Sequence, residues 1–154
     1  MGDIMSKIEN YWQKYAKQKQ LSLVVPDSWM FGDGTKEMGN KLGSLVIQGV
    51  KTGTCGAKCI YDLENEKIPE VGQYDIVLDG TNSPIAIIQY TKIELVPMNN
   101  VSKEFARSEG EGDLSYDYWY KGHKAFFSWE LSQYDLNYVD ELLLVCQTFK
   151  VVNM

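Results

Sequence analysis

Two short segments of this chain gather residues that could do chemistry. Residues 49–54 place the ammonium of Lys51 beside the hydroxyls of Thr52 and Thr54, with glycines on both sides. Residues 109–113 place three carboxylates at alternate positions with glycine between them. A solvated loop needs neither arrangement. Together the segments predict a polar site built from an amine, hydroxyls and carboxylates.

An amine, a hydroxyl and a carboxylate gathered in one site would suit hydrolysis through a hydroxyl nucleophile. The amine can accept the hydroxyl proton, and the carboxylate can hold that amine in place. Because a carboxylate in contact favours the protonated amine, the amine acts as a base only if burial outweighs the carboxylate charge. Otherwise it stabilises a developing oxyanion or phosphorane. The alternative is that these residues are structural, with Lys51 in an ion pair and Thr54 an ordinary strand residue.

Glu109, Glu111 and Asp113 also admit a different chemistry. Carboxylates alternating with glycine can bend round a hard cation such as Mg²⁺ or Ca²⁺, which would favour phosphodiester cleavage. In the alternative, the glycines form a helix exit and Asp113 or Ser115 caps the next helix, which we favour for Asp113. We expect no cofactor or metal, with a divalent cation at these carboxylates as the less favoured alternative.

Aromatic residues and the single histidine are further candidates. Trp29 and Phe31 lie in a glycine-rich loop, where a ring could stack on a nucleobase, worth about 1–3 kcal/mol, or plug the end of a barrel. His123 shares a predicted helix face with Trp119 and residues 126–127. It could contact a substrate phosphate or base, or make one structural hydrogen bond.

Charge is distributed unevenly along the chain, whose net charge is -6. Residues 1–60 carry eight lysines against five carboxylates (+3), residues 61–120 four basic groups against twelve (-8), and residues 121–154 three against four (-1). Lysines of the first third are typical of solvated helix faces but leave room for an anionic substrate. Because Arg107 is the single arginine, we expect no binding of duplex DNA.

The length of 154 residues predicts one domain. No apolar run approaches the roughly 20 residues of a membrane span, and the first residues lack a signal-peptide layout, so we expect a cytoplasmic protein without a membrane partner. Three cysteines, two of them Cys55 and Cys59, and one histidine argue against structural zinc and a disulfide framework.

Apolar periodicity predicts a helix over about residues 3–19, with one face formed by Ile4, Ile8, Tyr11, Trp12 and Tyr15. Thr35 is expected to cap a second helix that ends at Gly49. Strands are expected at about 54–61, 73–79, 84–95 and 141–152, and further helices at about 100–107 and 115–130. Short strands this close together favour a mostly antiparallel sheet or small barrel.

Five blocks, in this order, resemble the ASCH family over about residues 28–152. They are Trp29-x-Phe31-Gly32-Asp33, Leu45-Val46-x-x-Gly49-x-Lys51-Thr52-x-Thr54, Gly72-x-Tyr74-x-Ile76-x-Leu78-Asp79-Gly80, Pro84 with the apolar strand behind it, and Val101-x-x-x-Phe105-Ala106-x-x-Glu109-Gly110-Glu111-Gly112-Asp113. The resemblance implies an α+β fold, a PUA-like small, mostly antiparallel β-barrel with flanking helices. We expect residues 1–154 to form one such domain, with residues 1–27 as an N-terminal helical extension.

The resemblance also implies a role in RNA metabolism. ASCH proteins have been assigned as RNA-binding modules, as single-strand-specific ribonucleases and, in a short bacterial branch, as amidohydrolases that deacylate N4-acetylcytidine. The catalytic set of that branch maps onto Lys51, Thr54 and Glu109. We assign substrate contacts to Trp29, Phe31, Thr52, Arg107, Glu111 and His123. The expected partner is a nucleoside, nucleotide or short single-stranded RNA, and hydrolase, ribonuclease and binding module all stay open.

Overall fold

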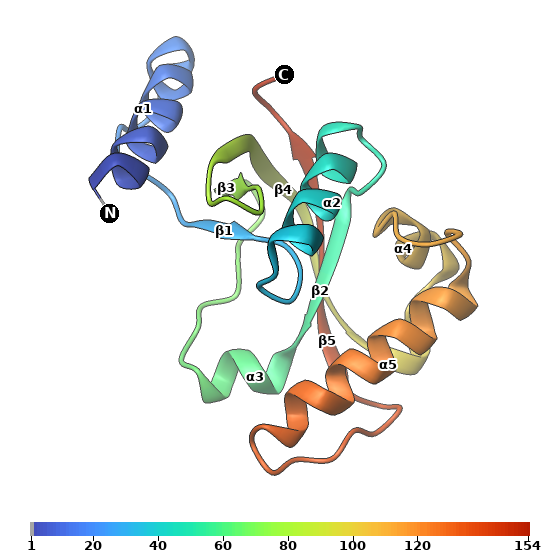
Figure 1. Ribbon diagram of the computed structural model, residues 1–154. Helices are drawn as coiled ribbons and strands as arrows, with labels where there is room; N and C mark the ends of the chain where they lie inside the picture. Colours follow the sequence, from blue (N-terminus) through green and yellow to red (C-terminus); the bar gives the residue numbers. More distant parts are fainter. Residues whose placement is uncertain (1) are drawn as a thin grey trace. The chain divides into compact units, whose positions relative to one another are not determined.

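The structure is a computed structural model that describes residues 2–154, with side chains from residue 6 onward (Figure 1). The backbone falls into two compact units. The first comprises Met1–Val50, Gly72–Gln89 and Lys150–Met154, and the second comprises Lys51–Val71 and Tyr90–Phe149.

Five strands form one sheet in the order β1-β3-β4-β5-β2. Their bounds are β1 Ser28–Met30, β2 Gly53–Ala57, β3 Tyr74–Leu78, β4 Pro84–Pro97 and β5 Leu143–Val151. The pairs β3/β4 and β2/β5 are antiparallel, whereas β1 runs parallel to β3. The mixed α+β class expected from the sequence is confirmed.

The helix α1 (Gly2–Lys19) begins the first unit and matches the predicted segment. Ile8, Trp12 and Tyr15 are buried in one apolar cluster together with Ile76 and Ile87 from the sheet. The 3.6-residue period therefore selected the correct face. The side chain of Ile4, which we placed on the same face, lies outside the described residues.

Helix α2 (Lys36–Ile47) also follows its sequence signals. The Thr35 side chain accepts a hydrogen bond from the backbone N–H of Met38 at 3.3 Å, which satisfies one of the free amides at the helix start. Gly49 has a φ of +76°, the left-handed conformation that ends many helices. Both expected ends of this helix are confirmed.

The strand predicted at 54–61 was wrong in its second half. β2 stops at Ala57, and the chain turns directly into the short helix α3 (Lys58–Leu63). Lys58 and Asp62, at helical i,i+4 spacing, form an ion pair of 2.7 Å, and Ile60 is buried in the core of the second unit. The loop expected before α2 also contains the short strand β1, whose pairing depends on β3.

The second unit continues with a 3-10 helix (Met98–Asn100), α4 (Lys103–Ser108) and α5 (Tyr116–Ser132). Its core joins Trp119, Phe127 and Leu131 of α5 to Leu144 and Cys146 of β5. α5 is therefore anchored through one face, which fixes the direction of the polar side chains beside Trp119. No helix within the described residues is both long and apolar enough to cross a membrane.

Candidate functional site

Lys51 stands where the chain enters β2, and the backbone there is tied to the end of α4. The amide of Thr52 donates to the carbonyl of Ser108 at 2.7 Å, and the amide of Phe149 donates to the carbonyl of Thr52 at 3.0 Å. The approach is so close that a Cβ on Gly53 would lie 2.3 Å from Ser108 Oγ. A side chain at the first residue of β2 would therefore have to displace the Ser108 hydroxyl.

The Lys51 ammonium is almost fully buried, with 2% of the side chain exposed, and acceptors surround it. Its Nζ lies 3.0 Å from the carbonyl of Gly53, 3.2 Å from the carbonyl of Glu109, 3.4 Å from Glu109 Oε1 and 3.5 Å from Glu111 Oε2. Two of these four acceptors are backbone carbonyls and two are carboxylate oxygens, so the amine is surrounded by hydrogen-bond acceptors.

Glu109 supplies the counter-charge from the residue that follows α4. Ser102 caps that helix by accepting from the amide of Phe105 at 3.0 Å, and Gly110 leaves it with a φ of +74°. The Glu109 carboxylate is thereby turned inward, where Oε2 accepts from Trp119 Nε1 at 2.8 Å and from the Cys55 thiol at 3.1 Å. Both carboxylate oxygens are thus committed.

His123 completes the arrangement from α5. Its ring stacks on Trp119 with centroids 4.5 Å apart. Nδ1 lies 2.8 Å from the Trp119 carbonyl, and Nε2 lies 3.2 Å from Glu109 Oε2. A carbonyl and a carboxylate both accept, so the two contacts favour the form of the imidazole in which both ring nitrogens donate. We call Lys51, Glu109, Glu111 and His123 the charge cluster.

These contacts shift the ionisation of the buried groups. Burial raises the pKa of Glu109, but the His123 hydrogen bond and the charges of Lys51 and His123 outweigh it and lower the pKa to about 2. Burial lowers the pKa of His123, but the hydrogen bond and charge of Glu109 raise it above its ordinary value. Burial, reinforced by the Glu109 charge, raises the pKa of the Cys55 thiol well above its ordinary value. Cys55 is therefore a protonated donor rather than a thiolate nucleophile.

Two groups of side chains could be considered as ligands for a cation, and the structure shows what each group contacts. Lys51 lies in contact with Glu109 and Glu111, while Asp113 accepts from the amide of Ser115 at 2.9 Å. Ser115 caps α5, as the alternative interpretation of this segment anticipated. A different set, Cys55, Glu109 and His123, offers donor atoms within 4.8 Å of one another. In this structure both Cys55 and His123 use those atoms to hydrogen-bond Glu109.

Thr54, the expected nucleophile, lies away from this group. It pairs with Gln147 across β2 and β5, one position before the pair of Cys55 and Cys146. Because successive side chains of a strand point to opposite faces, Thr54 faces away from the Cys55 thiol that contacts Glu109. The structure therefore joins Lys51 to Glu109 and places the Thr54 hydroxyl on the other face of β2.

The remaining predicted contacts are dispersed. Trp29 and Phe31 belong to the first unit, where their rings meet edge to face at 4.5 Å and Trp29 Nε1 donates to Asp75 Oδ2 at 2.9 Å. Phe31 is buried, which agrees with a packing role for that ring. Thr52 takes part through its backbone, as described above. Arg107 is exposed in the last turn of α4.

Sequence reasoning missed Cys55 and Trp119 as partners of Glu109. Trp119 carried a usable signal, since it lies one helical turn before His123 and an indole N–H buried on the core face needs an acceptor. Cys55 carried none, because its contact depends on how β2 passes the end of α4.

Known proteins share this architecture. The ASCH domain family model matches residues 27–153. The crystal structure of protein EF3133 from Enterococcus faecalis V583 is 50% identical, with a TM-score of 0.89, covering 96% of this chain and 89% of that one. The crystal structure of an ASCH domain from Lactobacillus crispatus JV V101 is 29% identical, with a TM-score of 0.80, covering 96% of this chain and 91% of that one. A comparison with curated proteins finds no match. The family-model match and the two structural relatives establish that the chain belongs to the ASCH domain family, with the PUA-like fold expected from its sequence.

Proposed function

We propose that this ASCH protein recognises a nucleoside, as such or within a nucleotide or short single-stranded RNA, and hydrolyses an amide of the N4-acylated cytidine type. The observation that carries the proposal is the buried Lys51 ammonium held between Glu109 and Glu111. ASCH membership supports RNA or nucleotide binding in general. The amide chemistry is the finer part of the proposal.

Lys51 acts in this proposal as a fixed positive charge. Held by four acceptor groups, it stabilises the oxyanion that forms when water adds to the acyl carbon. The bond between that carbon and N4 then breaks, giving a carboxylic acid and cytidine. Glu109 is the positioning residue for Lys51, since one of its oxygens contacts the ammonium and the other is held by Trp119 and His123.

Recognition of the base falls to the more accessible members of the charge cluster. The side chains of Glu111 and His123 are 26% and 18% exposed, against 2% for Lys51. A carboxylate is the usual acceptor for the exocyclic N4 of cytosine. We therefore assign the N4 contact to Glu111, with His123 beside it.

The test measures acetate release from N4-acetylcytidine and cleavage of labelled single-stranded RNA by one preparation, with and without chelator. We expect amide hydrolysis that survives the chelator, because no proposed step uses a metal. Glu111→Gln should raise KM at least tenfold with a smaller effect on kcat, since it keeps the shape but loses the strong acceptor. Amide hydrolysis that stops in chelator, or is absent, would overturn the proposal.

Thr54→Val is the second variant, because it removes the hydroxyl and keeps the shape. If Thr54 is the nucleophile that the family resemblance implies, turnover should fall by three orders of magnitude or more. If water attacks directly, the variant should keep turnover within about tenfold. Thermal unfolding of each variant controls for loss of fold. RNA cleavage that requires a cation would instead support the ribonuclease alternative.

A further inference from the structure

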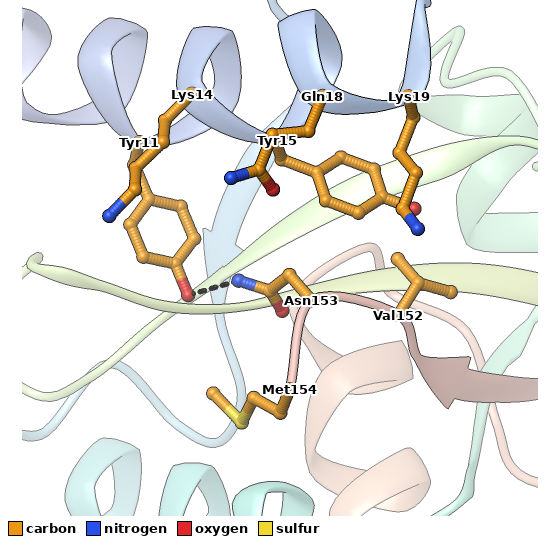
Figure 2. Close-up of a pocket in the computed structure, with 8 residues that line it drawn as sticks. All are labelled: Tyr11, Lys14, Tyr15, Gln18, Lys19, Val152, Asn153 and Met154. Carbon is orange, nitrogen blue, oxygen red and sulfur yellow. Dashed lines mark hydrogen bonds between the residues drawn. The ribbon is translucent and has the colours of Figure 1, made fainter.

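A cavity of about 440 Å³ lies between α1 and the last residues of the chain, within the first unit (Figure 2). Its lining side chains are Tyr11, Lys14, Tyr15, Gln18, Lys19, Val152, Asn153 and Met154. A second, more open cavity of about 450 Å³ shares Tyr11 and Lys14 with it and adds Lys7. We call the two adjoining cavities the basic groove.

Hydrogen bonds join the walls of the basic groove. The amide of Val152 donates to the carbonyl of Ile87 at 2.9 Å, and the amide of Ile87 donates to Asn153 Oδ1 at 2.8 Å. The same Asn153 donates from Nδ2 to the Tyr11 hydroxyl at 2.7 Å, the contact drawn in Figure 2. These contacts connect α1 to the final segment and to β4 within the first unit.

The charged side chains that line the groove are all basic. Lys7, Lys14 and Lys19 line it, and none of the side chains shown lining the two cavities is acidic. In a chain of net charge -6 this is a local reversal, and it favours an anionic ligand. Lys7 and Lys14 are seven residues apart on α1, about 10 Å along the helix axis, so the charge extends along a line.

Tyr11 supplies a different kind of contact at the junction of the two cavities. The ring is half-buried and lines both of them, with lysines on either side along α1. Lysines that follow a phosphate backbone, combined with an aromatic ring on which a base can stack, are the features that bind single strands without reading sequence. Lysine ammonium groups contact phosphates as point charges.

We propose that the basic groove is an accessory binding site for single-stranded RNA. Lys7, Lys14 and Lys19 contact successive phosphates, and a base stacks on Tyr11. The helix that carries these four residues precedes residues 27–153, the part matched by the ASCH domain family model. One wall of the groove therefore lies outside the region that the family model matches, and the other includes Val152 and Asn153 within it. The proposal rests on the proposed function only for its choice of RNA as the anion.

Fluorescence anisotropy of a 12-nucleotide fluorescein-labelled oligouridine at low salt tests this site on the full chain. We expect the double variant Lys14→Gln/Lys19→Gln to raise Kd at least tenfold. The dependence of log Kd on log salt should weaken by about 1.4, since each of the two lost phosphate contacts contributes about 0.7 for single strands. Tyr11→Leu should raise Kd about fivefold or more, the fold-change expected for a lost base stack.

Lys17→Gln is the matched control, because Lys17 is exposed on the same helix, carries the same charge and is absent from the lining of both cavities. It should leave Kd within twofold of wild type. If Lys17→Gln weakened oligouridine binding as much as the groove variant, the attraction would be diffuse and the groove proposal would be overturned. Absence of oligouridine binding by folded wild type would also overturn it. Displacement of the oligomer by uridine monophosphate at equal concentration would show a mononucleotide pocket and overturn the single-strand proposal.

The two proposals can fail separately. N4-acetylcytidine carries no phosphate, so its turnover should be unchanged in Lys14→Gln/Lys19→Gln. Loss of oligouridine binding in that variant, in a protein that shows no amide hydrolysis, would leave the groove standing and remove the proposed reaction. Normal oligouridine binding by the double variant, in a protein that hydrolyses the amide, would remove the groove and leave the proposed reaction standing.

Discussion

The charge cluster of the second unit and the basic groove of the first use charged residues in opposite ways. In the cluster, Lys51 and Glu109 are both 2% exposed, and their charged atoms bind other charged or polar groups of the protein. In the groove, Lys14 and Lys19 are exposed and line an open cavity. Charges of the first kind support the local fold as well as the proposed reaction, whereas charges of the second kind are open to solvent and to a ligand.

The energetic consequences differ for the same reason. Removing one partner of a buried ion pair leaves the other charge without compensation in a poorly solvating interior. Removing an exposed lysine changes stability little, because its ammonium is hydrated in both the folded and the unfolded state. Stability measurements should therefore respond to the charge cluster, and ligand-binding measurements should respond to both regions.

Glu109→Gln should have the largest effect on stability. The substitution keeps the side-chain volume but leaves the Lys51 ammonium and the His123 imidazole without their shared counter-charge, which we expect to cost about 3–5 kcal/mol. Urea unfolding followed by tryptophan fluorescence measures the change. Glu111→Gln is the matched control, since its side chain is 26% exposed, and should cost about 1 kcal/mol or less. A Glu109→Gln protein as stable as that control would show that the pair contributes nothing to folding.

The pH dependence of stability should show the same pair. The pKa of Glu109 is lowered to about 2, so its contribution is present above the ordinary value of 4.5 and is lost as pH falls from there toward 2. A difference of this size corresponds to about 3 kcal/mol. The pKa of His123 is raised above 6.5, so its contribution is present below 6.5 and is lost as pH rises through the higher folded value.

Unfolding free energies at a series of pH values between 2 and 9 would test this window. Stability should be greatest between about pH 4.5 and 6.5, and the decline on the alkaline side should disappear in His123→Gln. If the free energy of unfolding of His123→Gln still falls at high pH as it does in wild type, another group causes that loss of stability.

Gly53→Ala should have an intermediate effect, through packing alone. The new Cβ would lie 2.3 Å from Ser108 Oγ, and such overpacking costs about 1–3 kcal/mol. Ser108→Ala removes that oxygen, so the double variant should recover part of the loss. If the two changes simply add in a double-mutant cycle, the clash is not the cause.

Local signals in the sequence predicted much of the fold. The apolar period of α1, the Thr35 cap and Gly49 act within a few residues, and all three are confirmed. The errors fell where distant segments decide. β1 exists because Trp29 pairs with Val77, and β2 ends early because the chain after Ala57 packs as a helix.

The candidate site was predictable to a similar extent. The blocks that resemble ASCH proteins predicted Lys51 and Glu109 as site residues, and the structure places these residues in contact. The sequence could not reveal that Cys55 contacts Glu109 and that Thr54 faces away from that thiol. Which side chains of β2 face the end of α4 depends on the tertiary structure. The groove at Tyr11 and Lys14 was equally hidden, since α1 alone resembles any solvated helix.

The smallest effect on stability is expected from the groove itself. Lys14→Gln/Lys19→Gln should change the free energy of unfolding by no more than about 0.5 kcal/mol, because both side chains are exposed and the Tyr11 contact to Asn153 that joins α1 to the final segment is untouched. The measurement is urea unfolding beside wild type and Lys17→Gln. A loss above about 1 kcal/mol would mean that these lysines hold α1 in place. The two substitutions would then weaken RNA binding by destabilising the protein. The groove lysines would no longer differ from the charge cluster in their effect on stability.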